Sequence, residues 1–131
     1  MNEEQYLIMK VKSASREDHL VMLYDLLLQD IDEAEISLSG KGGSVDLAQA
    51  GFAVARAINV LTELNRTLDF RFNPGLCSQL NGLYVFFTRE LSAALKEANP
   101  VLIQNIIPMI TGLRDTWAQA RDLVNNQAQA A

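Results

Sequence analysis

Residues 73–100 read NPGLCSQLNGLYVFFTRELSAALKEANP, and this stretch decides the fold class. It begins and ends with Asn-Pro, which joins a helix-capping side chain to a proline suited to the first helical position. Between the two pairs, apolar residues recur every three or four positions, as on the buried side of an amphipathic helix. The stretch therefore predicts one helix over about 74–98 and the start of another at Pro100. The apolar positions are Leu76, Leu80, Leu83, Tyr84, Phe87, Leu91, Ala94 and Ala98.

Two further helices are predicted before this stretch. Ser15 is followed three residues later by Asp18 and then by an apolar run, a variant of the capping box that marks a helix start. The glycine-rich turn at 39–43 ends this first helix. A second apolar stripe follows Ser44, begins with Leu47 and ends around 69–70.

The last helix is predicted from Pro100 to about Val124, with Met109 and Val124 among its core-facing residues. The polar tail at 125–131 is expected to fray. Pro108 lies inside the predicted helix and has no N–H to donate to the preceding turn. Gly112 follows one turn later and loosens the same stretch. We therefore predict a kink near Pro108.

Four long helices with short connections predict an all-α fold. Short connections make neighbouring helices antiparallel, so we expect an up-down-up-down four-helix bundle over residues 13–124. Residues 1–12 are expected to form a short N-terminal helical segment. A length of 131 residues suits one domain, and 49% apolar but only 7% aromatic residues suits helix packing.

Composition argues against nucleic acid and membrane partners. The formal net charge is -5 and the basic residues are scattered singly, so no basic patch for phosphates is expected. No apolar run is long enough to span a bilayer, and the start MNEEQYLIMK does not resemble a signal peptide. We therefore expect a cytoplasmic protein without membrane insertion. The single Cys77 excludes an internal disulfide framework and is interpreted as a small buried hydrophobe.

No residues point to catalysis, a cofactor or a metal site. His19 is the only histidine, but it lies in a first helical turn among acidic residues, whereas phosphotransfer bundles use a mid-helix histidine beside a basic residue. The glycines at 40–43 follow no strand and lack the spacing of nucleotide-binding loops. We expect a protein that is not an enzyme and binds no cofactor. The densest acidic run, interpreted as a solvated face, is Asp30, Asp32, Glu33 and Glu35.

Each predicted helix also carries large apolar residues away from its core stripe. A monomeric bundle cannot bury them internally, and each would contribute about 1.5–3 kcal/mol if a partner buried it fully. We interpret them as a partner-binding surface, with a wider core or a homodimer interface as the alternatives. These residues are Met22, Leu26, Phe52, Val60, Val85, Phe86, Ile103 and Ile107.

Several short motifs occur in a set order along residues 6–120. They comprise Tyr6, Val11, Ser13 to Ser15 and Met22 to Asp25, then Ala57 to Asn59, Leu64, Leu68 and Asp69, then Leu83, Tyr84, Arg89 and Leu91, and finally Leu113 to Asp115 with Trp117. In this order they resemble the flagellin-specific export chaperones of the bacterial flagellar type III secretion system, the FliS family. The sequence departs from the family pattern at Arg16, Leu26 and Leu95, which replace a proline, a glycine and an asparagine.

The resemblance implies a cytoplasmic chaperone that binds the disordered C-terminal segment of flagellin, prevents premature polymerisation and delivers flagellin to the export gate. It also implies that the N-terminal segment covers part of the apolar surface and takes part in gate docking, which gives Tyr6 and Val11 a regulatory role. Two alternatives stay open. One is a homodimeric structural or regulatory bundle without a flagellin client, and the other is a phosphotransfer protein that uses His19.

Overall fold

The computed structural model describes residues 2–5 and 15–130, with side chains described as far as Gln127. Its four long helices are α2 (Arg16–Ser39), α3 (Leu47–Arg66), α4 (Pro74–Glu97) and α5 (Pro100–Ala130). Residues 3–5 form a single helical turn, and no strand occurs in the described ranges. The predicted all-α class is therefore confirmed.

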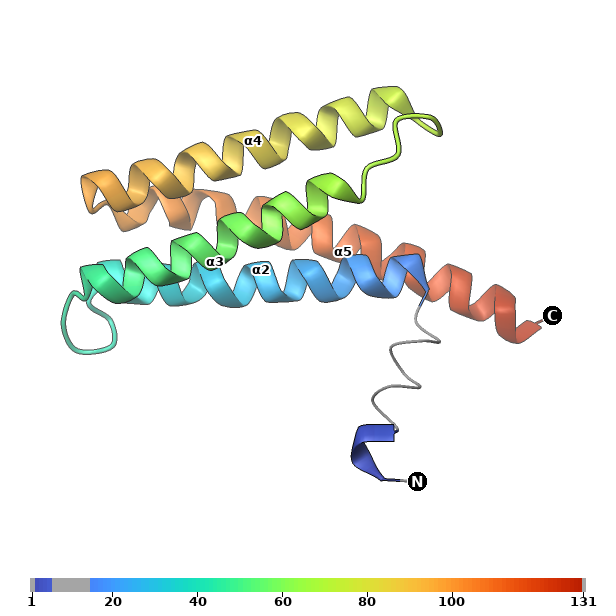
Figure 1. The fold of residues 1–131 in the computed structure, drawn as a ribbon, viewed down its shortest axis with the longest axis horizontal. Helices are drawn as coiled ribbons and strands as arrows, with labels where there is room; N and C mark the ends of the chain where they lie inside the picture. The colour runs from blue at the N-terminus through green and yellow to red at the C-terminus, as the bar shows by residue number, and fades with distance from the viewer. Residues whose placement is uncertain (1, 6–14, 131) are drawn as a thin grey trace.

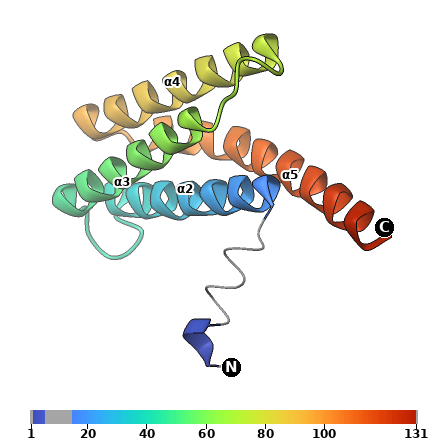
Figure 2. The same ribbon diagram turned by 45° about the vertical axis from the view of Figure 1, so that its right-hand side comes forward.

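The four helices run in alternating directions along the long axis of the molecule (Figure 1). α2 packs most extensively against α3 and α5, and α4 packs against the same two helices. The end of α4 lies close to the start of α5 at their short connection, and the two helices separate away from it, as Figures 1 and 2 both show. This arrangement is consistent with the predicted up-down-up-down bundle.

The capping side chains act where the sequence predicts them. The Ser15 hydroxyl accepts from the backbone N–H of Asp18 at 3.1 Å, and a carboxylate oxygen of Asp18 accepts from the N–H of Ser15 at 2.9 Å. This hydrogen bond from the Ser15 backbone holds the pKa of Asp18 below its usual value. At the other end of α2, Gly40 adopts φ 77°, a left-handed conformation that glycine takes without strain.

The two Asn-Pro pairs open α4 and α5 as predicted. The side-chain oxygen of Asn73 accepts from the N–H of Leu76 at 3.1 Å, and that of Asn99 accepts from the N–H of Val101 at 3.1 Å. The helix between the glycine turn and Asn73 is shorter than predicted. It is capped by Asp46 and ends at Arg66, because the chain turns away several residues before 69–70.

The apolar stripes of all four helices converge on one core. Cys77 is buried, as the sequence predicts. Four residues predicted to face the core are exposed instead, because each lies at a helix end where fewer neighbours cover it. Leu47 and Leu76 lie in the first turns of α3 and α4, Ala98 is the C-cap of α4, and Val124 lies near the C-terminal end of α5.

A hydrogen bond between two tyrosine side chains crosses this core. The hydroxyl groups of Tyr24 on α2 and Tyr84 on α4 lie 2.6 Å apart, in hydrogen-bonding contact, and both side chains are buried. Burial raises the pKa of both tyrosines, and for Tyr84 the neighbouring Tyr24 adds to the rise. The bond therefore joins two neutral hydroxyls at ordinary pH.

Ion pairs connect α2 to its two neighbours. Arg56 on α3 lies 3.3 Å from a carboxylate oxygen of Asp30 and also pairs with Glu33. On the other side, Arg114 of α5 lies 2.8 Å from a carboxylate oxygen of Asp25. Within residues 2–5 and 15–127, no ion pair joins α4 to another helix. Helix α4 is therefore held by apolar packing and by the tyrosine pair.

The acidic run on α2 is not a uniformly solvated face, so that prediction is wrong for Glu35. Its side chain is buried and accepts hydrogen bonds from Lys41 at 2.7 Å and from Gln104 of α5 at 2.8 Å. Burial alone would raise the pKa of Glu35, but these two hydrogen bonds outweigh it and hold the pKa below its usual value. Asp32 is the one exposed residue of the run, while Asp30 and Glu33 are half-buried and pair with Arg56.

Helix α5 runs unbroken through Pro108, whose side chain is exposed, so any bend there leaves the helix continuous. The kink itself stays a prediction. The helix also continues to Ala130, past the point at Asn125 where fraying is predicted. Its C-terminal part projects beyond the start of α2 in both ribbon views (Figures 1 and 2).

The tyrosine pair predicts a non-additive response to mutation. Changing Tyr24→Phe or Tyr84→Phe alone leaves a buried hydroxyl without its partner, which should lower the free energy of unfolding by about 1–3 kcal/mol. The double variant removes both hydroxyls, so its loss should be smaller than the sum of the single losses. Urea unfolding of the four proteins, followed by circular dichroism, measures this coupling. Strictly additive losses would contradict it.

Candidate partner-binding surface

Five of the predicted partner-binding residues lie on the surface with much of their side chain open to solvent. Their exposed fractions are 54% for Met22, 49% for Leu26, 65% for Phe52, 42% for Val85 and 40% for Phe86. They come from α2, α3 and α4, so exposed apolar groups are spread over several helices rather than gathered at one point.

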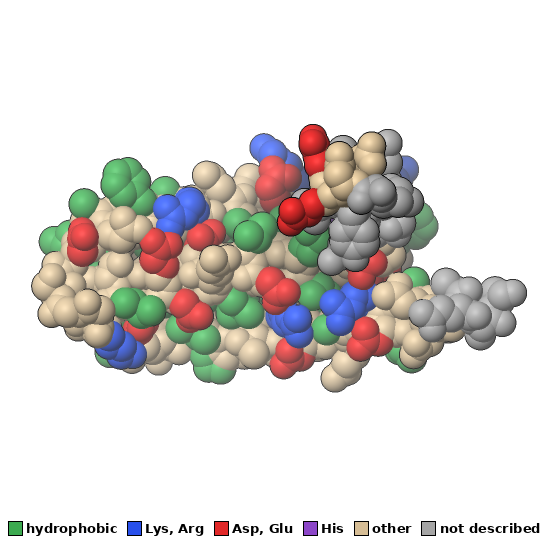
Figure 3. Space-filling view, turned by 90° about the horizontal axis from the view of Figure 1, so that it is seen from below, with side chains coloured by type: hydrophobic (Ala, Val, Ile, Leu, Met, Phe, Trp, Pro, Cys, Tyr) green, Lys and Arg blue, Asp and Glu red, His purple; other side chains and the backbone are tan. Residues whose placement is uncertain are grey.

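Charged residues border these apolar side chains. Met22 and Leu26 are one helical turn apart on α2, and between them lies Asp25, which pairs with Arg114. Phe52 precedes Arg56 by one turn on α3, and Arg56 pairs with α2. Figure 3, which views the molecule from below, shows apolar patches separated by acidic and basic groups. This pattern suits separate apolar anchors surrounded by a polar rim.

Ile103 does not belong to this surface, and its prediction as a partner-binding residue is wrong. It is fully buried beside Ile106 and Ile110, whereas Met109, predicted to face the core, is 42% exposed. The buried stripe of α5 is thus rotated relative to the predicted one. The rotation agrees with the hydrogen bond from Gln104 to Glu35, which holds the side of α5 that carries Gln104 against α2.

The remaining predicted residues divide into two groups. Val60 and Ile107 are partly buried and pack against the core, so they offer only part of their side chains to a partner. Tyr6 and Val11 lie outside the described residues.

Exposed aromatic residues in the α3–α4 connection were missed by the sequence reasoning. Phe70 and Phe72 are 50% and 80% exposed. The guanidinium of Arg71 lies 5.9 Å from the centre of the Phe72 ring and also pairs with Asp69 at 2.9 Å. The sequence does contain a signal for their exposure. Both aromatic residues lie just before the Asn73 cap, in a connection between helices, and such connections usually lie on the surface.

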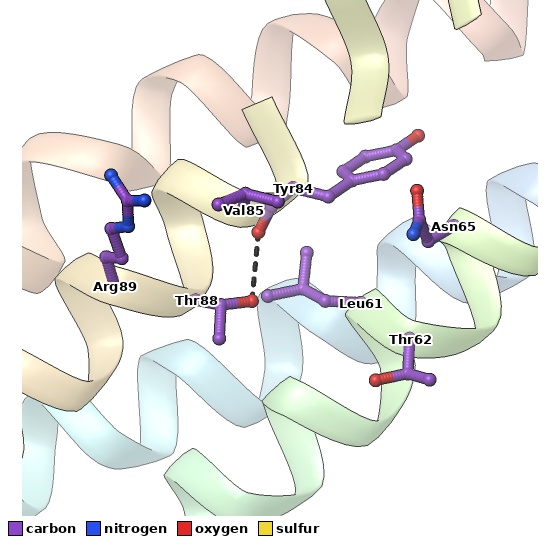
Figure 4. Close-up of a pocket in the computed structure, with 7 residues that line it drawn as sticks. All are labelled: Leu61, Thr62, Asn65, Tyr84, Val85, Thr88 and Arg89. Atoms are coloured by element: carbon purple, nitrogen blue, oxygen red, sulfur yellow. Dashed lines mark hydrogen bonds between the residues drawn. The ribbon is translucent and has the colours of Figure 1, made fainter. Parts of the chain in front are cut away.

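A groove of about 230 Å³ lies between α3 and α4 (Figure 4). We call it the α3–α4 groove. One of the predicted partner-binding residues, Val85, lines it. The full lining is Leu61, Thr62, Asn65, Tyr84, Val85, Thr88 and Arg89.

A second hollow, of about 190 Å³, lies where the start of α2 meets the α3–α4 connection. We call it the end hollow. Its wall includes Arg16 and Leu20 of α2, Phe72 of the connection, Cys77 of α4 and Trp117 of α5. Side chains from four segments of the chain therefore meet there, most of them apolar.

The described side chains contain no group of three or more His, Cys, Asp and Glu residues placed to hold a metal ion. None of the described helices combines the length and apolar character needed to cross a membrane. His19 is exposed in the first turn of α2.

Comparison with known proteins identifies the family. The family model described as "Flagellar protein FliS" matches residues 1–124. The chain belongs to the FliS family. A FliS relative from Campylobacter jejuni subsp. jejuni serotype O:6 (strain 81116 / NCTC 11828), named "Flagellar secretion chaperone FliS", is 29% identical over 109 residues, which cover 83% of this chain and 80% of the relative. The resemblance found in the sequence motifs is therefore confirmed.

Leu26, one of the positions at which the resemblance predicts a different residue, lies on the surface. A glycine in its place would offer no side chain, whereas Leu26 exposes about half of its side chain next to Met22. The apolar patch on α2 is therefore larger than it would be with a glycine at this position.

The burial pattern predicts that core and surface positions respond differently to truncation. Ile103→Ala should lower the free energy of unfolding by about 2–5 kcal/mol, because it leaves a cavity in the core. Phe52→Ala should change it by less than about 0.5 kcal/mol, because the ring is already exposed. Urea unfolding of both variants tests the assignment. Equal losses would show that Ile103 is not a core residue.

Proposed function

We propose that this chain is a cytoplasmic chaperone for flagellar export that binds the disordered C-terminal segment of flagellin, prevents its premature polymerisation and delivers it to the export gate. Membership of the FliS family supports a role in the flagellum. The name of the Campylobacter relative supports a chaperone role in secretion. The role requires no catalysis and no cofactor.

The observation that carries the proposal is the spread of exposed apolar side chains over α2, α3 and α4. A compact partner meets one face of a small protein, whereas a disordered segment can follow a path across several helices and fold as it binds. Its apolar residues would cover Met22, Leu26 and Phe52 on one part of the path, and Val85 and Phe86 on another.

The energy balance of such a complex suits an export chaperone. Each apolar side chain that becomes fully buried contributes about 1.5–3 kcal/mol. Ordering the disordered segment offsets about 2–5 kcal/mol of this gain. A few anchors therefore hold the segment specifically, and the complex can still dissociate when flagellin is exported. While bound, the segment is not free to pack against other flagellin molecules.

Substituting the exposed anchors should weaken flagellin binding without unfolding the protein. We expect Met22→Glu combined with Phe86→Glu to weaken binding of a flagellin C-terminal segment by about tenfold or more, since a charge replaces each apolar contact. Val45→Glu is the matched control, because Val45 is also an exposed apolar residue but lies in the connection between α2 and α3. Copurification and isothermal titration calorimetry measure binding.

The same experiment separates the chaperone from the alternative of a homodimeric bundle. Sedimentation velocity without flagellin gives the oligomeric state of the wild type and of the double variant. Two results together would favour the homodimeric bundle over the chaperone. The wild type would form a stable dimer that the double substitution dissociates, and it would not bind flagellin.

The N-terminal segment provides a second test, based on the regulatory role predicted for Tyr6 and Val11. If this segment competes with flagellin for apolar surface, deleting residues 1–12 should increase affinity for the flagellin segment. If it contacts the export gate, the same deletion should weaken binding to the gate component. Titration calorimetry with each partner distinguishes the two effects, with Glu3→Gln in the full chain as the control. Unchanged binding to both partners would refute the regulatory role.

A further inference from the structure

The α3–α4 groove differs in charge from the molecule as a whole. The chain has a formal net charge of -5, yet no carboxylate lines the groove. Among the described residues, Arg89 is the one charged side chain in its lining and makes no ion pair. An unpaired arginine beside an apolar floor favours a ligand that carries a negative charge.

The hydrogen-bonding groups that line the groove indicate which side chains can bind a ligand. The hydroxyl of Thr88 donates to the backbone oxygen of Tyr84 at 2.9 Å, and that of Thr62 donates to the backbone oxygen of Ile58 at 2.9 Å. Each hydroxyl has therefore already given its one hydrogen to its own helix. In the described part of the chain, the side chains of Asn65 and Arg89 have no such partner, so their N–H groups are the side-chain donors available to a ligand.

These two groups stand apart with an apolar surface between them. Figure 4 shows Arg89 on α4 at one side of the groove, Asn65 on α3 at the other, and Leu61 between them. Val85 lies one helical turn from Arg89 and leaves 42% of its side chain exposed. Residues one turn apart on a helix have Cβ atoms about 5–6 Å apart. A helical ligand with an apolar residue and a carboxylate three or four positions apart matches this spacing.

We propose that the α3–α4 groove docks an amphipathic helix formed by the bound partner, with an apolar side chain on Leu61 and Val85 and an aspartate or glutamate on Arg89. The inference rests on the proposed function, in which this partner is the flagellin segment. The planar guanidinium can donate two parallel hydrogen bonds to a carboxylate, which fixes the register of the helix in the groove. Asn65 binds polar groups at the other end.

The first experiment removes the charge of Arg89. Isothermal titration calorimetry measures binding of the C-terminal segment of the flagellin from the same bacterium to the wild type and to Arg89→Gln. Arg66→Gln is the matched control, because Arg66 is an exposed arginine on α3 that pairs with Glu63 and does not line the groove. We expect Arg89→Gln to bind about fivefold more weakly and Arg66→Gln to bind like the wild type. Thermal unfolding checks that both variants keep the wild-type fold.

A charge exchange identifies the carboxylate that Arg89 contacts. Arg89→Glu is titrated with flagellin segments in which each aspartate or glutamate is changed in turn to lysine. We expect one of these segments to recover binding to Arg89→Glu and to lose binding to the wild type. Such a reciprocal pattern follows from a direct contact and not from a change in net charge alone.

The outcomes separate the groove assignment from the proposed function. If the wild type binds the segment and Arg89→Gln binds equally well, or loses no more than Arg66→Gln, the groove assignment is overturned and the chaperone function stands. If no lysine substitution recovers binding to Arg89→Glu, the contact with a carboxylate is overturned. If the wild type does not bind the segment, both proposals fail.

Discussion

The hydrogen bond between Tyr24 and Tyr84 connects two helices that lie on opposite sides of the core and are not direct neighbours. Ion pairs fasten α2 to α3 and to α5, but α4 relies on apolar contacts, which are tolerant of small rotations. Each buried hydroxyl serves as the hydrogen-bond partner of the other, and leaving either one unsatisfied costs free energy. The bond therefore favours the rotation of α4 about its axis that directs Tyr84 toward Tyr24.

This rotation decides which side chains of α4 reach the surface. With Tyr84 directed into the core, Phe87 one turn later is also buried, and Val85 and Phe86 are turned toward solvent. Arg89 then follows Val85 by one turn, at the edge of the α3–α4 groove. Val85 and Phe86, two of the apolar residues that we assign to flagellin binding, are thus exposed because Tyr84 and Phe87 of the same helix occupy the core. A single buried contact supports both the fold and the surface proposed for the partner.

Signals between residues close in sequence predicted the helices and their caps well. Features that depend on contacts between two helices were not predicted. The Ser15, Asn73 and Asn99 caps could be recognised because each involves residues close in sequence. Ile103 could not be placed, because α5 contains adjacent apolar pairs that allow two stripes, and its contact with α2 selects one of them. Glu35 was misjudged for the same reason, since its partner Gln104 is far away in sequence. The α3–α4 groove likewise requires the relative position of two helices.

The end hollow has a consequence for observing this protein at work. Its wall contains Trp117 and Cys77, which are the only tryptophan and the only cysteine of the chain. Indole fluorescence depends on the polarity around the ring, and the rate of thiol alkylation depends on access to the sulfur. The sequence thus carries an optical probe, Trp117, and a chemical probe, Cys77, in the wall of the same hollow. Both report whether the hollow is open or filled, without any engineered label.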